Sequence, residues 1–152
     1  MTGAAPQQLD RAGIAALIPH QGAMCLLDTL DTWDAQHIVC TTHGHVDAAH
    51  PLRSASGLLA SAAIEYAAQA AALHGGLLAQ AQGHRATPGY LASARGVTLH
   101  RLRLDDLPGA LTITAERQAG DARQLLYGFR VTHAGAPVVT GRLAVVLDTP
   151  LL

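Results

Sequence analysis

The chain has 152 residues, of which 49% are hydrophobic and 14% are charged, and this suits one domain with a substantial core rather than two domains. Its formal net charge is −1, with only ten basic residues, all of them arginine. A nucleic-acid binder, which needs a strong positive excess, is therefore excluded.

The N-terminal part predicts a loose tail, a short helix and one strand. Residues 1–8 form the tail, and no basic segment followed by an apolar one marks a signal peptide. Residues 9–20 (LDRAGIAALIPH) are typical of a short helix that ends at Pro19. An apolar run follows and leads into a polar bend over residues 31–34. Residues 37–46 (HIVCTTHGHV) alternate and are rich in β-branched side chains, which predicts a strand.

A long helix is predicted for a markedly apolar segment, residues 58–73. The segment consists of Ala, Leu and Ile except for four residues with polar side chains, Ser61, Glu65, Tyr66 and Gln69. Its composition favours a helix, and the following "HGG" predicts that Gly75 lies just beyond the helix end. The apolar run is too short to span a bilayer, so no membrane contact is expected. Two cysteines without a CxxC motif favour a reducing compartment, and a cytoplasmic protein is expected.

The second half of the chain predicts four consecutive strands, separated by turn signals. Their ranges are 90–104, 109–118, 124–135 and 136–148. Helices and strands segregated in this way indicate an α+β protein. A helix that is apolar nearly all round must be covered on most sides, which a curved antiparallel sheet can do. The sequence therefore predicts a single hotdog domain over residues 1–152, with a long central helix wrapped by the sheet.

One carboxylate interrupts the predicted central helix. On a helix, Glu65 and Gln69 are adjacent on a face that is otherwise apolar. Burial of an unpaired carboxylate is costly enough that the group usually becomes neutral, and a glutamate with raised proton affinity suits a general acid. A structural explanation stays open, in which Glu65 pairs with an arginine of the sheet or reaches solvent at the helix edge.

Four sequence segments occur in the order found in the bacterial dehydratases that act on 3-hydroxyacyl groups of acyl carrier protein (ACP). Residues 18–30 (IPHQGAMCLLDTL) resemble the family segment PHR-x-PxLLVDR. "HPL" at residues 50–52 and "IEYAAQA" at residues 64–70 resemble its histidine and its helical E-A-x-A-Q motif. Residues 97–113 (VTLHRLRLDDLPGALTI) are similar to ARFKRPVxPGDxL. The resemblance extends over residues 18–117, most of the chain.

The segment before the central helix departs from this family pattern. "HPLRSASGLLA", residues 50–60, stands where the family has HFPGxPxMPG, so the Pro-Gly pair is missing. "HPLR" followed by IEYxAQAxAxHGG is similar to a divergent branch of the family, associated with aryl polyene and related pigment or polyketide clusters. This departure concerns the acyl substrate more than the reaction.

The resemblance implies reversible loss of water from a (3R)-3-hydroxyacyl thioester, which gives a trans-2-enoyl thioester. His50 would be the base at C2, and Glu65 would be the acid or would position water. Helix N-terminal amides at Ala60 and Ser61 would stabilise the thioester oxygen, and Gln69 would lie beside the substrate. No cofactor is implied beyond the phosphopantetheine that carries the substrate on ACP.

The resemblance also implies partners. The family places the histidine and the carboxylate on different subunits, so His50 would act with Glu65 of a neighbouring copy in a homodimer or a multiple of dimers. A heterodimer with a related dehydratase is the alternative. Arg95, Arg101 and Arg103 would meet acidic ACP or the phosphopantetheine phosphate, unless they form a solvated strand face.

Other interpretations follow from the histidines and from the fold. His43 and His45 would lie on one side of a strand with His50 following, but no further ligand completes a set, so no metal is expected. His20 is interpreted as a structural hydrogen-bonding residue. A hotdog thioesterase, and a non-catalytic subunit that supports a related dehydratase, stay open as alternative functions.

Overall fold

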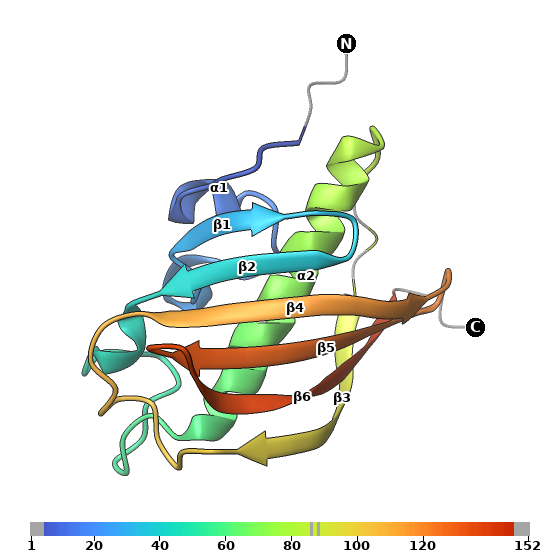
Figure 1. Cartoon of the computed structure of the whole chain (residues 1–152). Coiled ribbons are helices and arrows are strands. Elements are labelled where there is room, and N and C mark those ends of the chain that lie inside the picture. Colours follow the sequence, from blue (N-terminus) through green and yellow to red (C-terminus); the bar gives the residue numbers. More distant parts are fainter. Residues whose placement is uncertain (1–4, 86, 88, 148–152) are drawn as a thin grey trace.

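A curved antiparallel sheet wraps around one long helix (Figure 1). The computed structural model describes residues 5–85, 87 and 89–147. The strands are β1 (Thr29–Trp33), β2 (His37–Thr42), β3 (Gly89–Leu99), β4 (Leu111–Gly120), β5 (Gln124–His133) and β6 (Ala136–Leu147). They pair in the order β1-β2-β4-β5-β6-β3, and every pair is antiparallel. This is the predicted hotdog fold, which the structure confirms.

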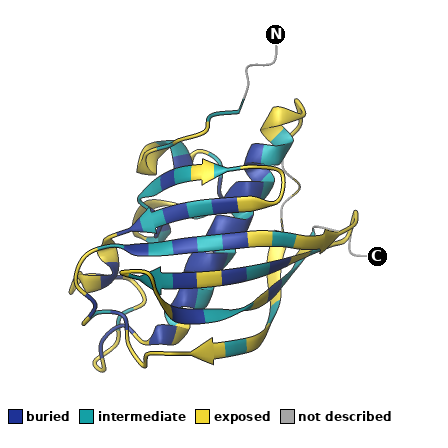
Figure 2. Ribbon diagram, viewed as in Figure 1, coloured by how far each residue is buried: buried dark blue, intermediate teal, exposed yellow. Residues whose placement is uncertain are grey.

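Helix α2 (Ala63–Ala81) is the centre of the core. It lies against β2, β4 and β5, and most of it is buried beneath the sheet in Figure 2. Small alanines on the helix allow the sheet to approach closely, and larger aliphatic side chains fill the space between them. The fully buried side chains of this core include Leu27, Leu30, Ile38, Leu73, Leu77, Leu111 and Ile113.

The other helical segments are short. α1 spans Arg11–Ala15, and three 3-10 turns span Gly22–Met24 (η1), Gly44–Val46 (η2) and Ala60–Ala62 (η3), the last leading into α2. The helix predicted for residues 9–20 is therefore mostly irregular. In the described part of the chain, no helix is long and apolar enough to cross a membrane.

The sequence predicted that the helix ends just before Gly75, but α2 continues to Ala81. Gly76 instead allows close packing of the helix, because a Cβ there would lie 3.0 Å from the carbonyl oxygen of Leu17. Gly83, two residues beyond the end of the helix, has a φ of +75°. His84 N–H donates to the Ala79 carbonyl at 2.8 Å, the pattern of a helix end with a left-handed glycine.

Two strand predictions were wrong in detail. The polar bend predicted at residues 31–34 is largely strand β1, and only its last residue, Asp34, begins the turn. The Asp34 carboxylate accepts from the N–H groups of Gln36 and His37, at 2.8 and 2.7 Å. β2 ends at Thr42, so the segment with His43 and His45 is not strand. The last predicted strand is β6, and Asp148 lies outside the described residues.

β3 forms one edge of the sheet. It pairs with β6 on one side, and its other edge has no strand partner within the described chain. Tyr90 is 67% exposed, and Leu91 and Leu99 are 41% and 44% exposed. A long, apolar, unpaired edge is a surface to which another strand can add.

Candidate active site

Glu65 lies in the first turn of α2, at the edge of the buried helix face. Its side chain is 30% exposed, and Oε1 is 3.0 Å from Nε2 of His20. Gln69 Nε2, one turn along the helix, donates to the same oxygen at 3.3 Å. The carboxylate is thus neither unpaired nor neutralised by an arginine of the sheet. Its partner is an imidazole from the segment between α1 and β1.

Gln69 ties this segment to the helix. Its side chain is buried, its Oε1 accepts from Leu26 N–H at 2.9 Å, and its Nε2 donates to the Met24 carbonyl at 2.7 Å. Arg11 binds the other side of the segment through the Cys25 carbonyl. Gln69 therefore lies beside Glu65 as expected, but its amide group also binds the main chain of Met24 and Leu26 to the helix. Its contact with substrate stays a prediction.

His20 is the residue of this site that the sequence interpretation missed. Its side chain is 28% exposed. Nδ1, however, is buried and has no hydrogen-bond partner among the described residues. The available signal was its place directly after Pro19, inside the segment that resembles a dehydratase motif. A single histidine in such a loop does not reveal which helix residue it will meet.

A groove of about 580 Å³ opens beside Glu65 and His20. One wall is the half-exposed face of α2, where Ala68, Ala72 and Gly75 follow Glu65. The opposite wall comes from β3, β5 and β6 and includes Tyr90, Leu91, Leu125, Tyr127 and Val145. A predominantly apolar groove with a few polar groups at one end is typical of a site for an acyl chain.

His50 occupies a different environment within the chain. It is 8% exposed, its Nδ1 accepts from Leu52 N–H at 3.1 Å, and its Nε2 is 2.8 Å from the Tyr66 hydroxyl. Because Nδ1 is an acceptor, the neutral ring carries its proton on Nε2 and donates to Tyr66. Burial lowers the pKa of His50. Within one chain, the structure brings His20 and not His50 to Glu65.

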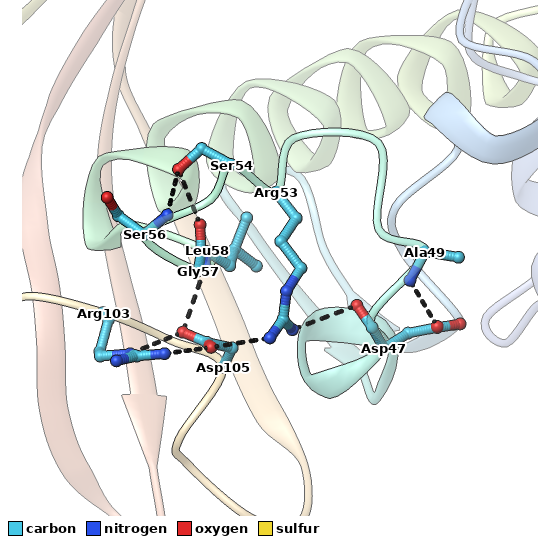
Figure 3. A network of polar contacts seen from close by, with 9 residues as sticks. All are labelled: Asp47, Ala49, Arg53, Ser54, Ser56, Gly57, Leu58, Arg103 and Asp105. Atoms are coloured by element: carbon cyan, nitrogen blue, oxygen red, sulfur yellow. Dashed lines mark hydrogen bonds and ion pairs between the residues drawn. The ribbon is translucent and has the colours of Figure 1, made fainter.

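The segment that replaces the family linker is held by Asp105 (Figure 3). The Asp105 carboxylate accepts from Leu58 N–H at 3.1 Å and from Arg103 Nε at 2.9 Å, and Arg53 Nη2 lies 3.3 Å away. Arg103 holds the pKa of Asp105 well below its usual range. Gly57 passes over this cluster with φ +94°, and a Cβ there would lie 2.6–2.8 Å from its atoms. The linker is therefore an ordered loop between His50 and α2.

The other predicted site residues are not gathered at Glu65. Ala60 N–H donates to the Leu102 carbonyl at 3.0 Å, while Ser61 is exposed at the start of the helical segment. Arg95 is exposed on β3, and Arg101 and Arg103 lie beyond its end, since β3 stops at Leu99. None of the three arginines lines the groove beside Glu65, and the guanidinium of Arg103 is paired with Asp105.

The chemistry available at this site is proton transfer. A carboxylate and an imidazole 3.0 Å apart can share one proton and deliver or accept it at the end of an apolar groove. In the described residues, no three His, Cys, Asp or Glu side chains lie close enough together to hold a metal ion.

Solved structures with the same fold include a dehydratase complex and thioesterases. The dehydratase heterocomplex ApeI:P from Xenorhabdus doucetiae matches with a TM-score of 0.81 and 22% identity, over 90% of this chain and 91% of that chain. A thioesterase from Haemophilus influenzae matches with a TM-score of 0.65 and 13% identity, over 95% and 94%. AziG of S. sahachiroi matches with a TM-score of 0.59 and 18% identity, over 88% and 99%. These likenesses show the fold.

The comparison with protein families is more specific. A search of the curated proteins finds no match to the chain. The model of the ApeP-like family, described as the ApeP dehydratase, matches residues 12–150. This match includes α2 and all six strands, and the chain therefore belongs to the ApeP-like family of dehydratases.

Proposed function

We propose that the chain is a subunit of a dehydratase that acts on (3R)-3-hydroxyacyl groups carried on the phosphopantetheine of ACP, in aryl polyene assembly. The observation that carries this proposal is the pairing of Glu65 with His20 at the end of the apolar groove. A thioester of this kind needs a long apolar site for its acyl chain and a proton donor at its 3-hydroxyl, and the groove and the pair supply these two parts.

In the proposed reaction a base removes the proton from C2, and the electrons of that bond form the double bond between C2 and C3. The C3–O bond breaks, and the hydroxyl leaves as water after it takes a proton from Glu65. The proton shared between Glu65 and His20 is the one transferred. The amide of Ser61 is the proposed donor to the thioester oxygen, because the amide of Ala60 is already bonded to Leu102.

The proposed base is a histidine from a second subunit. In a homodimer it would be His50, which burial keeps in the neutral form that a base requires. Leu52 and Tyr66 occupy both of its ring nitrogens in the single chain. One of these contacts must therefore give way to substrate before His50 of this chain can accept a proton.

The occupied ring of His50 favours a second candidate function, a heterodimer with a related dehydratase. In that arrangement the chain supplies the groove and Glu65, and its partner supplies the base. The unpaired edge of β3 offers the surface for either partner, since an added strand would continue the sheet. ACP would bind at the outer end of the same shared site.

The test is an assay of the purified chain alone and mixed with a related dehydratase, on a 3-hydroxyacyl-ACP. Mass spectrometry of the carrier distinguishes an enoyl product, which has lost water, from a carrier that has lost its acyl group. We expect the enoyl product, at a higher rate with the partner present if the heterodimer is the active form. Release of free acid would instead identify a thioesterase.

Glu65→Gln is expected to lower the dehydration rate by about 10²- to 10⁴-fold, because the shape is kept while the proton donor is lost. The melting temperature should change little, since the side chain is partly exposed. His50→Ala is expected to be inactive as well in a homodimer. Mixed dimers of the two variants should then regain activity, and failure of verified mixed dimers to do so would refute a shared homodimeric site.

A further inference from the structure

The groove beside Glu65 does not end where a short acyl chain would end. A second cavity of about 720 Å³ lies next to it, and the two share Gly75, Thr87, Leu125 and Leu147 as lining residues. The walls of this second cavity are more polar and include Gln82, His84, Arg85, Arg117 and Asp121. The two cavities therefore adjoin at Gly75, between Glu65 and the far end of α2.

The distance from Glu65 to the second cavity follows from helix α2, which lines both cavities. With a rise of about 1.5 Å per residue, Gly75 lies about 15 Å beyond Glu65 along α2 and Ala79 about 21 Å beyond it. An extended chain gains about 1.2 Å per bond, so about a dozen bonds separate the carboxylate from the level of Gly75. Longer acyl chains must pass Gly75 to be accommodated.

Gly75 places no side chain at the boundary between the two cavities. Its neighbour Gly76 faces Leu17 and has no room for a side chain, whereas a Cβ built at Gly75 meets no atom within 4 Å. Glycine in the middle of a helix is unfavourable by about 0.5–1 kcal/mol relative to alanine, so the helix itself gives no reason for a glycine at this position. The space that a side chain would occupy at Gly75 belongs to the groove.

We propose that Gly75 determines the acyl-chain length that the site accepts. Its missing side chain lets chains of more than about a dozen bonds pass from the apolar groove into the polar cavity beyond. The distal end of such a substrate lies among polar side chains, so a polar terminal group is tolerated there. This inference rests on the proposed function, because it assigns the groove to the acyl chain of the substrate.

The test compares the wild-type chain with Gly75→Leu, together with whichever partner the activity requires. kcat/KM is measured on a short-chain and a long-chain 3-hydroxyacyl-ACP. For Gly75→Leu we expect a loss of at least about tenfold on the long substrate, the effect of a side chain that blocks a pocket, and little change on the short one. If Gly75→Leu has the same kcat/KM as the wild type on both substrates, or loses activity equally on both with the fold intact, the inference is overturned.

Gly75→Ala is the matched control. Its activity on the long substrate should lie between those of the wild type and Gly75→Leu, because a methyl group takes up less of the groove than a leucine side chain. It should melt at the same or a higher temperature, because alanine favours the helix and a Cβ there meets no atom within 4 Å. A separate binding experiment with long- and short-chain acyl-ACP keeps the two proposals distinguishable. If wild-type protein dehydrates neither substrate, the proposed function fails. Selective loss of long-chain binding in Gly75→Leu would still support the role of Gly75, and unchanged binding would refute it.

Discussion

The hydroxyl of Tyr66 accepts the hydrogen bond that the buried ring of His50 donates. Tyr66 stands at the position after Glu65, where the dehydratase motif E-A-x-A-Q has alanine. An alanine could not reach the imidazole, whereas the tyrosine hydroxyl lies 2.8 Å from Nε2 of His50. Burial also raises the pKa of the Tyr66 hydroxyl, so the tyrosine stays protonated and neutral. One substitution at the helix thus gives the histidine a fixed partner inside its own chain.

Tyr66→Phe is expected to destabilise the protein by about 1–3 kcal/mol, the cost of leaving a buried ring N–H without an acceptor. The pKa of His50 should fall further, because the lost hydrogen bond also stabilised the protonated ring. NMR titration of the His50 ring protons and urea unfolding measure these two effects.

Tyr127→Phe is the control for this prediction, since it removes another buried tyrosine hydroxyl bonded to a histidine, His74, at 2.7 Å. It should cost a similar amount of stability and leave the titration of His50 unchanged. An unaltered His50 titration in Tyr66→Phe would contradict the assigned contact.

At the scale of elements, the loop between His50 and α2 depends on a residue that follows β3. Asp105 accepts from Leu58 N–H in the loop and pairs with Arg53 and Arg103. The missing Pro-Gly pair of the family linker is therefore compensated by an ion-pair cluster. The cluster fixes the start of the helical segment that carries Glu65.

Asp105→Asn should lower the unfolding free energy at neutral pH and lower activity, because the loop loses its charged anchor. The pKa of Asp105 is depressed in the folded protein. Its stabilisation is therefore fully present above the ordinary carboxyl pKa near 4 and is lost as pH falls through the depressed value. The stability difference between wild type and variant should shrink in acid, as measured by urea unfolding across pH.

Asp106→Asn is the matched control, one residue further along on the exposed side of the turn. It removes the same charge without touching Leu58 or Arg53. We expect its stability to follow wild type at every pH. A difference in unfolding free energy between wild type and Asp105→Asn that stays constant into strong acid would contradict the depressed pKa of Asp105.

At the scale of the whole molecule, the exposed edge of β3 is the predicted contact with a second subunit. In the proposed dimer, Leu99→Arg should shift the protein toward the monomer, because a charge would enter an apolar strand edge where Leu99 is 44% exposed in the single chain. Light scattering after size-exclusion chromatography measures the change. Leu126→Arg on β5, at a site of similar exposure (39%), should leave the dimer intact. A dimeric Leu99→Arg would place the interface elsewhere.

The fold was largely predictable from the sequence, because the apolar helix and the alternating strands are local patterns. The errors arose where tertiary contacts override local preference. Gly75 and Gly76 belong to a groove and to a close approach to Leu17, not to a helix end. β1 was missed because Asp31 and Asp34 are typical of a turn, although the Asp31 carboxylate accepts from the hydroxyls of Thr29 in the same strand and Thr41 in β2.

The candidate site was predictable only in part. Glu65 stands out because a carboxylate in an apolar helix is rare, and it does lie at a groove. The contact with His20 spans 45 positions of sequence, and nothing local encodes it. The pairing of His50 with Tyr66 likewise depends on how a loop folds back on the helix. Such contacts are set by the assembled core rather than by any single motif.

The unpaired edge of the sheet at β3 also affects the solubility of the protein during its production. Without the proposed partner, the described chain leaves this edge without a strand neighbour beside Tyr90 and Leu91, and such edges pair with like edges into aggregates. We therefore expect the chain to be more soluble when it is produced together with the proposed partner than when it is produced alone.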